Sequence, residues 1–199
     1  MAVESGRLLV LLGSRDLQTA AQLAAQVHQA PVVTLRQLQH LVTQGFVVVA
    51  TGTEGAVYHL HPKRSRADTA DLHERILVVE DDQFVRELAV TLLEDEQYVV
   101  IATQTPVDAK TLLEHVAFDL VITDSFRRGT EPVLLARADL LQAAGHTPVA
   151  LFTAHRAELL EAQAAGFAGL IAKPFDIAEF VAWARALLAP HLGQDGAPG

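Results

Sequence analysis

The feature that most constrains the fold of this chain is a repeated alternation of short apolar runs and amphipathic stretches from residue 75 to 188. Five apolar runs have the length and composition of strands, and each precedes a stretch with apolar residues at helical spacing. This alternation is typical of βα units, which build a doubly wound parallel sheet covered by helices on both faces. The predicted strands are 76–79, 98–102, 120–123, 149–152 and 169–172, and the predicted helices are 84–94, 107–116, 132–143, 157–165 and 177–188.

Four of the predicted strands end on polar residues that suit the same chemistry. In an open parallel α/β sheet the carboxyl ends of the strands share one rim, and ligands bind there. Carboxylates, a hydroxyl and an ammonium on one rim suit a hard divalent cation and a phosphoryl group. The strand ends carry Glu80, Asp81 and Asp82, then Asp124, Thr153 and Lys173.

Each strand end also has a simpler explanation when it is taken alone. An acidic cluster before a helix is more often an N-cap, because carboxylates accept the free N–H groups and favour the helix dipole. A lone Asp, Thr or Lys after a strand is usually a turn residue or a solvated charge. Because all four ends fall on one rim in this order, the combination favours a binding site.

The first 60 residues have a different pattern. Helices are predicted at 5–12 and 18–28, and a third helix begins at Pro31 and ends at Gly45. Two strand-like runs, 46–50 and 56–60, flank a Gly-containing turn, which predicts a β-hairpin. These elements indicate a small α+β domain.

Charge and composition support a division of the chain. Residues 1–74 carry six positive and six negative side chains, whereas residues 75–199 carry nine positive and eighteen negative, so the net charge of -9 lies in the second part. That part is not expected to bind nucleic acid by itself, because phosphate neutralisation needs Lys and Arg. The predicted units are a domain at 1–60, a polar linker at 61–74, a domain at 75–190 and a flexible tail at 191–199.

Composition also excludes several classes of protein. The chain has no cysteine, so disulfides and thiolate metal sites are excluded. Half of the residues are apolar, which is enough for a full core, but no apolar stretch is long enough to span a bilayer. We therefore expect a soluble cytoplasmic protein without a membrane partner.

Residues 75–188 resemble the receiver domain of two-component response regulators, through the motifs ILVVEDDQFVR, FDLVITD, PVALFTA and IAKPF. The resemblance implies a flavodoxin-like fold and phosphorylation by a histidine kinase or phosphotransfer protein, with no enzyme activity beyond slow loss of the phosphoryl group. It implies Asp124 as phosphoacceptor, Thr153 and Lys173 as its partners, and a Lys173–Pro174 bond that is usually cis. The implied Mg²⁺ ligands are Glu80, Asp81, Asp124 and the backbone carbonyl of Phe126.

The residue types fit this chemistry independently of the resemblance. A carboxylate nucleophile forms an acyl phosphate only if its charge and that of the phosphoryl group are offset. A divalent cation at Glu80, Asp81 and Asp124 would supply two positive charges, and Lys173 would supply another.

Two positions depart from the receiver pattern. The loop at 125–131 does not carry Pro and Gly at the offsets from the phosphoacceptor that are usual in the family. We hypothesise that Phe126 hinders the water that hydrolyses the acyl phosphate and so lengthens its lifetime. Leu170 stands where many receivers carry an aromatic residue that turns inward on phosphorylation, so the usual aromatic switch is absent.

Residues 19–47 resemble the helix-turn-helix of bacterial winged-helix repressors, and the three helices with a hairpin have the outline of a winged helix. The resemblance implies DNA binding, and we also expect the chain to form a homodimer. Suitable residues are few, because the candidate wing carries acidic Glu54 and no Lys or Arg at its tip. The candidate DNA-binding residues are Arg36, Gln39 and His40 on the second helix of the motif, and Lys63, Arg64 and Arg66 beyond the wing.

Two functions therefore remain open for the front domain. Apolar Val32, Val33 and Leu35 are expected on the exposed face of its third helix, where they suit a protein partner or self-association. The chain is either a transcription regulator switched by phosphorylation or a phospho-gated adaptor. A receiver that never takes phosphate is disfavoured, because all five site residues are present.

Overall fold

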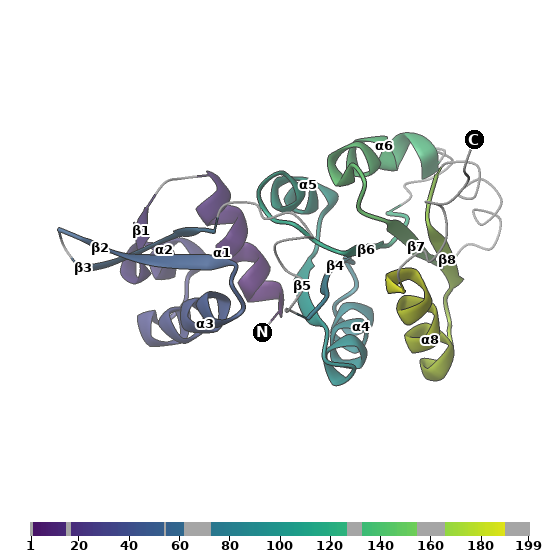
Figure 1. Cartoon of the computed structure of the whole chain (residues 1–199), viewed down its shortest axis with the longest axis horizontal. Coiled ribbons are helices and arrows are strands. Elements are labelled where there is room, and N and C mark those ends of the chain that lie inside the picture. The colour runs from purple at the N-terminus through teal and green to yellow at the C-terminus, as the bar shows by residue number, and fades with distance from the viewer. Residues whose placement is uncertain are drawn as a thin grey trace, which may run out of the picture.

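A parallel sheet forms the centre of the larger part of the molecule in the computed structural model (Figure 1). The structure describes residues 2–14, 17–53, 55–61, 73–126, 133–154 and 166–189, without the side chains of 2–4, 14 and 133–137. The sheet has five strands in the order β5-β4-β6-β7-β8. Its strands are β4 (Arg75–Val79), β5 (Val99–Thr103), β6 (Leu120–Thr123), β7 (Val149–Thr153) and β8 (Gly169–Ala172).

Helices cover both faces of this sheet. Successive side chains of a strand point to opposite faces, and those of β4 and β7 are all buried, so each face needs a cover. Leu77 and Val79 belong to a core cluster with buried residues of α5 and α6, whereas Ile76 and Val78 belong to a second cluster with α4 and α8. The predicted doubly wound parallel sheet is therefore confirmed. The helices are α4 (Gln83–Asp95), α5 (Pro106–His115), α6 (Val133–Ala144) and α8 (Ile177–Leu188); the predicted helix at 157–165 and the tail at 191–199 lie outside the described residues.

The inward face of α4 differs from the apolar spacing in the sequence. Phe84 and Leu88 have the helical spacing of core residues, yet their exposed fractions are 82% and 43%. Arg86 is buried in their place, in the same stripe as Ala89 and Leu93. The guanidinium can occupy this position because two main-chain carbonyl oxygens accept its hydrogen bonds.

The described residues of the front part form three helices and a three-stranded antiparallel sheet in the order β1-β3-β2. The predicted helix at 18–28 is wrong at its start, because Gln18 and Thr19 pair with β3 as a short strand. Thr19 then caps the following helix and forms a capping box with Gln22. The elements are α1 (Ala2–Ser14), β1 (Gln18–Thr19), α2 (Ala20–Val27), α3 (Pro31–Thr43), β2 (Val47–Gly52) and β3 (Gly55–Leu60).

The ends of α3 follow the predicted signals. Pro31 occupies the first turn, where the missing N–H costs no hydrogen bond. Gly45 has a φ of +72°, and its N–H donates to the carbonyl oxygen of Val42. The N–H of Phe46 donates to the carbonyl oxygen of Leu41, which completes a Schellman motif.

Helix α1 lies between the front sheet and strand β5 (Figure 1). Leu8 and Leu9 are fully buried in the same core cluster as Leu77 and Ile101 of the parallel sheet. A Cβ atom at Gly6 would overlap the carbonyl oxygen of Ala102 on β5, so the glycine permits this close approach. The two parts therefore share one continuous core.

A second contact between the two parts is made by Arg75, a buried arginine at the start of strand β4. The Nη2 atom of Arg75 donates to the carbonyl oxygen of Gln44 at 2.8 Å. Its guanidinium lies over the ring of Phe46, 4.2 Å from the centroid. Most of the predicted linker, residues 62–72, lies outside the described residues, so the division at 61–74 stays a prediction.

Within the described ranges, no helix combines the length and apolar character needed to cross a membrane.

Candidate functional site

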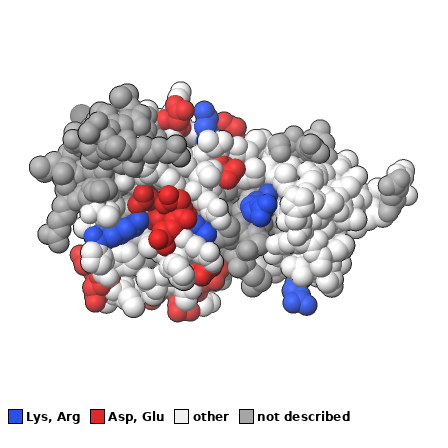
Figure 2. All heavy atoms as spheres, turned by 180° about the vertical axis from the view of Figure 1, so that it is seen from behind, with Lys and Arg blue, Asp and Glu red and all other residues white. Residues whose placement is uncertain are grey.

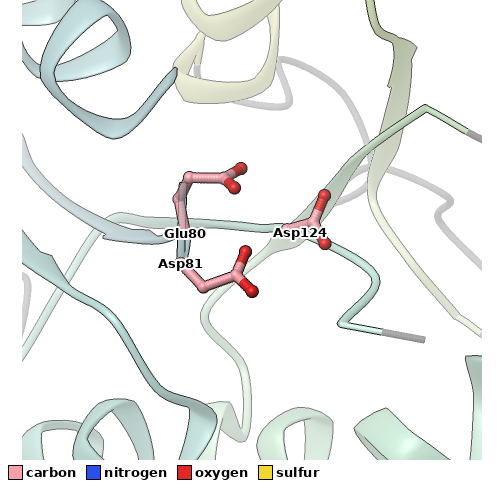
Figure 3. Close-up of side chains that lie close together, drawn as sticks. All are labelled: Glu80, Asp81 and Asp124. Carbon is pink, nitrogen blue, oxygen red and sulfur yellow. The ribbon is translucent and has the colours of Figure 1, made fainter. Parts of the chain in front are cut away.

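Three carboxylates converge where strands β4 and β6 end (Figure 3). Glu80 and Asp81 follow β4, and Asp124 follows the neighbouring strand β6, held by its N–H donating to the carbonyl oxygen of Val79 at 2.9 Å. One oxygen atom from each carboxylate lies within 4.8 Å of the others. Glu80 is buried, Asp124 is partly exposed and Asp81 faces solvent, so the group has an open side.

The neighbouring carboxylate of Asp82 caps helix α4 and does not belong to the rim. It accepts the N–H groups of Phe84 at 2.9 Å and Val85 at 3.0 Å, as the N-cap of α4. The simpler explanation of the acidic cluster therefore holds for one of its three residues. Glu80 and Asp81 remain for the rim.

The ammonium of Lys173 bridges two of the three rim carboxylates. Its Nζ atom lies 2.5 Å from Oε2 of Glu80 and 2.6 Å from Oδ1 of Asp124. The ammonium also lies over the ring of Phe152, 4.0 Å from the centroid. Lys173 follows β8 and is joined to Pro174 by a cis peptide bond. These ion pairs bring residues that are 93 and 49 positions apart into one charged cluster.

Burial raises the pKa of Glu80 above its ordinary value, and the hydrogen bond and charge of Lys173 oppose that rise. The proximity of Asp124 raises the pKa of Glu80 further. A carboxyl with a raised pKa takes up a proton more readily, and it must lose that proton before it can bind a cation. The ammonium therefore keeps Glu80 available as a ligand.

The second oxygen of Asp124 is held by the main chain. Its Oδ2 atom accepts the N–H of Phe126 at 2.8 Å. Phe126 has a φ of +46°, a conformation that bulky residues rarely adopt, and its partly buried ring packs against the core. The carbonyl of Phe126 remains a predicted metal ligand, and the rest of the loop, residues 127–132, lies outside the described residues.

The hydroxyl of Thr153 lies at the end of β7, completely buried, with its Oγ1 atom 3.5 Å from Oγ of Ser125. Ser125 is also buried and directly follows the predicted phosphoacceptor. Sequence reasoning missed Ser125, although a small hydroxyl residue beside Asp124 is a signal for such a partner. Leu170, where the aromatic residue is absent, is half-buried and packs against the core.

Arg86 is a second residue that sequence reasoning missed. Its Nη1 atom donates to the carbonyl oxygens of Glu80 at 2.6 Å and Asp81 at 3.1 Å. A charged residue in the core-facing register of an otherwise apolar helix face is the signal that could have identified it.

The predicted DNA-binding residues lie apart from the rim, on the front part. Arg36, Gln39 and His40 are exposed on α3, and Lys63, Arg64 and Arg66 lie outside the described residues. Val32 and Val33 are exposed on the same helix. Figure 2 shows acidic side chains gathered on the parallel-sheet part, while the visible surface of the front part carries few charges.

The rim residues fit Mg²⁺. Hard cations prefer oxygen ligands, and Glu80, Asp81 and Asp124 supply one buried, one exposed and one intermediate carboxylate around a common space. When bound there, the cation would supply positive charge against phosphoryl oxygens. Lys173 and the N–H of Phe126 already hold Asp124 by both of its oxygens. The arrangement suits acceptance of a phosphoryl group on a carboxylate.

Three solved structures are similar to this chain in fold. The non-phosphorylated HemR receiver domain from Leptospira biflexa is 28% identical, with a TM-score of 0.52 over 62% of this chain and 99% of that one. A response regulator from Thermotoga maritima is 23% identical, with a TM-score of 0.53 over 59% and 98%. The chemotaxis response regulator CheY4 of Vibrio cholerae is 21% identical, with a TM-score of 0.50 over 58% and 99%.

No curated protein matches the chain. The sequence profile described as "Response regulator receiver domain" matches residues 76–185, which is more than half of the chain. This segment contains the whole acidic rim and, apart from Arg75 at the start of β4, the five strands that position it. The chain therefore belongs to the response regulator receiver domain family.

Proposed function

We propose that the chain is a response regulator whose Asp124 accepts a phosphoryl group from a histidine kinase or phosphotransfer protein. The observation that carries this proposal is the ammonium of Lys173, which bridges Glu80 and Asp124 at 2.5 and 2.6 Å. In the transfer, a carboxylate oxygen of Asp124 forms a bond to phosphorus while the P–N bond of a phosphohistidine breaks. The imidazole leaves with the electron pair of that bond and takes up a proton.

The other rim residues have distinct proposed roles. Glu80, Asp81 and Asp124 would hold Mg²⁺ together with the carbonyl of Phe126. Lys173 would offset the charge of the phosphoryl group once Asp124 carries it. The hydroxyl of Thr153 would donate to a phosphoryl oxygen in place of its present contact with Ser125.

Labelling with acetyl phosphate and Mg²⁺, followed by mass spectrometry, tests this proposal. The wild-type protein should gain one phosphoryl group, and Asp124→Asn should gain none. Asp82→Asn is the matched control, because it removes one negative charge beside the site while Asn still caps α4. Modification that persists in Asp124→Asn would refute the assignment.

For the output, we propose that the front part is a winged helix that regulates transcription through DNA as a homodimer. Its chain order, α1-β1-α2-α3-β2-β3 with an antiparallel sheet, supports a winged helix. The exposed side chains of Arg36, Gln39 and His40 on α3 could reach base edges and phosphates.

One observation favours a second function, a phospho-gated adaptor. Val32, Val33 and Leu35 have exposed fractions of 66%, 43% and 36% on α3. Of the side chains described for the front part, those of Arg7 and Arg36 are the only ones from Lys or Arg. An apolar face with so few cations suits a protein partner better than a phosphate backbone.

Fluorescence polarisation with mixed duplex DNA at low salt distinguishes the two functions. The whole chain must be used, with and without acetyl phosphate, because α1 of the front part is buried against the parallel sheet. DNA binding that strengthens on phosphorylation would support the regulator. An absence of binding below about 100 μM, where non-specific binders normally register, would support the adaptor.

A further inference from the structure

The buried guanidinium of Arg86 lies directly behind the two acidic residues that end strand β4. Arg86 is 3% exposed, and its hydrogen bonds go to the carbonyl oxygens of Glu80 and Asp81. These are the two residues whose carboxylates face Asp124 across the rim. One side chain therefore holds the main chain of both acids.

Stability alone does not explain an arginine at this position. The Nε atom of Arg86 is buried and has no hydrogen-bond partner within the described residues. A buried charge is costly to desolvate, and an apolar side chain of similar size would fill the same space without that cost. The arginine differs from such a side chain in its hydrogen bonds to the two acidic residues.

The direction of these hydrogen bonds fixes how the acids face the rim. A hydrogen bond to the carbonyl oxygen of a residue restricts the backbone dihedral angles there, and so restricts the direction in which its side chain points. Glu80 receives a further restraint from the N–H of Asp82, which donates to its Oε1 atom at 3.2 Å. Arg86 thus limits the main chain, while Asp82 and Lys173 limit the carboxylate of Glu80.

We infer that Arg86 is a positioning residue for the metal-binding acids, because it holds the carbonyls of Glu80 and Asp81 so that both carboxylates face Asp124. The inference rests on the proposed binding of Mg²⁺ at this rim. Groups that orient metal ligands from behind typically change metal affinity by about 10- to 100-fold when they are lost. Arg86 should therefore affect Mg²⁺ affinity although it does not contact the cation.

Isothermal titration calorimetry of the whole chain with Mg²⁺ tests the inference without any phosphodonor. Wild type, Arg86→Met, Arg86→Lys and Leu93→Ala are compared, and urea unfolding without Mg²⁺ gives the stability of each. Leu93 is fully buried in the same inward stripe of α4, so Leu93→Ala destabilises the helix packing without altering the two carbonyls.

The dissociation constant for Mg²⁺ should rise about tenfold or more in Arg86→Met, and less in Arg86→Lys, whose ammonium can still donate to a carbonyl. It should stay at the wild-type value in Leu93→Ala. Unchanged affinity in Arg86→Met, or an equal loss in Leu93→Ala, would overturn the inference. If Arg86→Met does not fold, unchanged affinity in Arg86→Lys overturns it. A wild-type protein that binds no Mg²⁺ would instead refute the proposed metal site.

Discussion

The acidic rim and the exposed face of α3 differ in how their side chains are held. At the rim, Glu80, Asp124 and Lys173 form ion pairs at 2.5 and 2.6 Å, and the main chain holds Asp124 from its other side. On α3, Val32 and Arg36 are exposed to solvent. The chemistry of the rim can be inferred from its own geometry because its side chains are already held in place. The function of the exposed face depends on which partner binds it. Single substitutions should therefore disturb the rim far more than the face.

The largest effect is expected from removal of the bridging ammonium. Lys173→Met leaves the buried carboxylate of Glu80 without its opposing charge, so the free energy of unfolding at neutral pH should fall by about 3 kcal/mol. Urea unfolding measures this change. Lys110→Met is the matched control, because the Lys110–Asp139 pair is exposed and 4.0 Å apart, and its loss should cost no more than about 0.5 kcal/mol. Equal losses in the two variants would contradict the prediction.

The pH dependence of Lys173→Met follows from the same pair. Because burial raises the pKa of Glu80 in the folded state, the native protein binds more protons than the unfolded chain between the two pKa values. The contribution of Glu80 to stability therefore falls as pH rises through that interval and recovers as pH falls. Without Lys173 the pKa should rise further, so Lys173→Met should regain stability relative to wild type on acidification. A difference in the free energy of unfolding between wild type and Lys173→Met that is the same at neutral and at mildly acidic pH would argue against this.

The junction between the two regions should be the next most sensitive position. Gly6→Ala places a methyl group against the carbonyl oxygen of Ala102, and such overpacking typically costs about 1–3 kcal/mol. Gly13→Ala in the same helix is the matched control: its methyl group would lie 3.2 Å or more from side-chain atoms of His115 and Leu60, so it should cost less than Gly6→Ala. Differential scanning calorimetry should show one transition in which both parts melt together. Two separated transitions in the wild type would show that the shared core does not couple them.

A smaller effect at the rim is expected from Phe126. Asn adopts a positive φ more readily than Phe and is less bulky, so Phe126→Asn should relieve the strained main chain and admit water. The acyl phosphate should then be lost about tenfold faster, which corresponds to about 1.4 kcal/mol of barrier. Following the phosphorylated fraction over time after removal of the phosphodonor tests this. A wild-type half-life of minutes or less that Phe126→Asn leaves unchanged would contradict the role of Phe126.

The parts of the molecule that the sequence predicts are those with long, regular patterns. The run from Ile76 to Val79 is continuously apolar because it is buried on both faces, and the position of Glu80 follows from where it ends. Strand β1 has two residues, too few for any periodicity. The contacts of Arg86 and Gly6 depend on which face of a helix meets which strand, and no local pattern contains that information.

The smallest effect is expected on the exposed face of α3, and it separates the two proposed outputs. If the front part binds DNA, Arg36→Ala should weaken binding to all sequences and reduce the slope of log affinity against log salt by about 1, since one cation contacts one phosphate. Val32→Ser should leave that slope unchanged, because no charge is lost. If the front part binds a protein, Val32→Ser should weaken self-association in sedimentation experiments while Arg36→Ala has little effect. Because both residues are exposed on α3, neither substitution should alter the free energy of unfolding by more than about 0.5 kcal/mol. A change in binding can then be assigned to the surface itself.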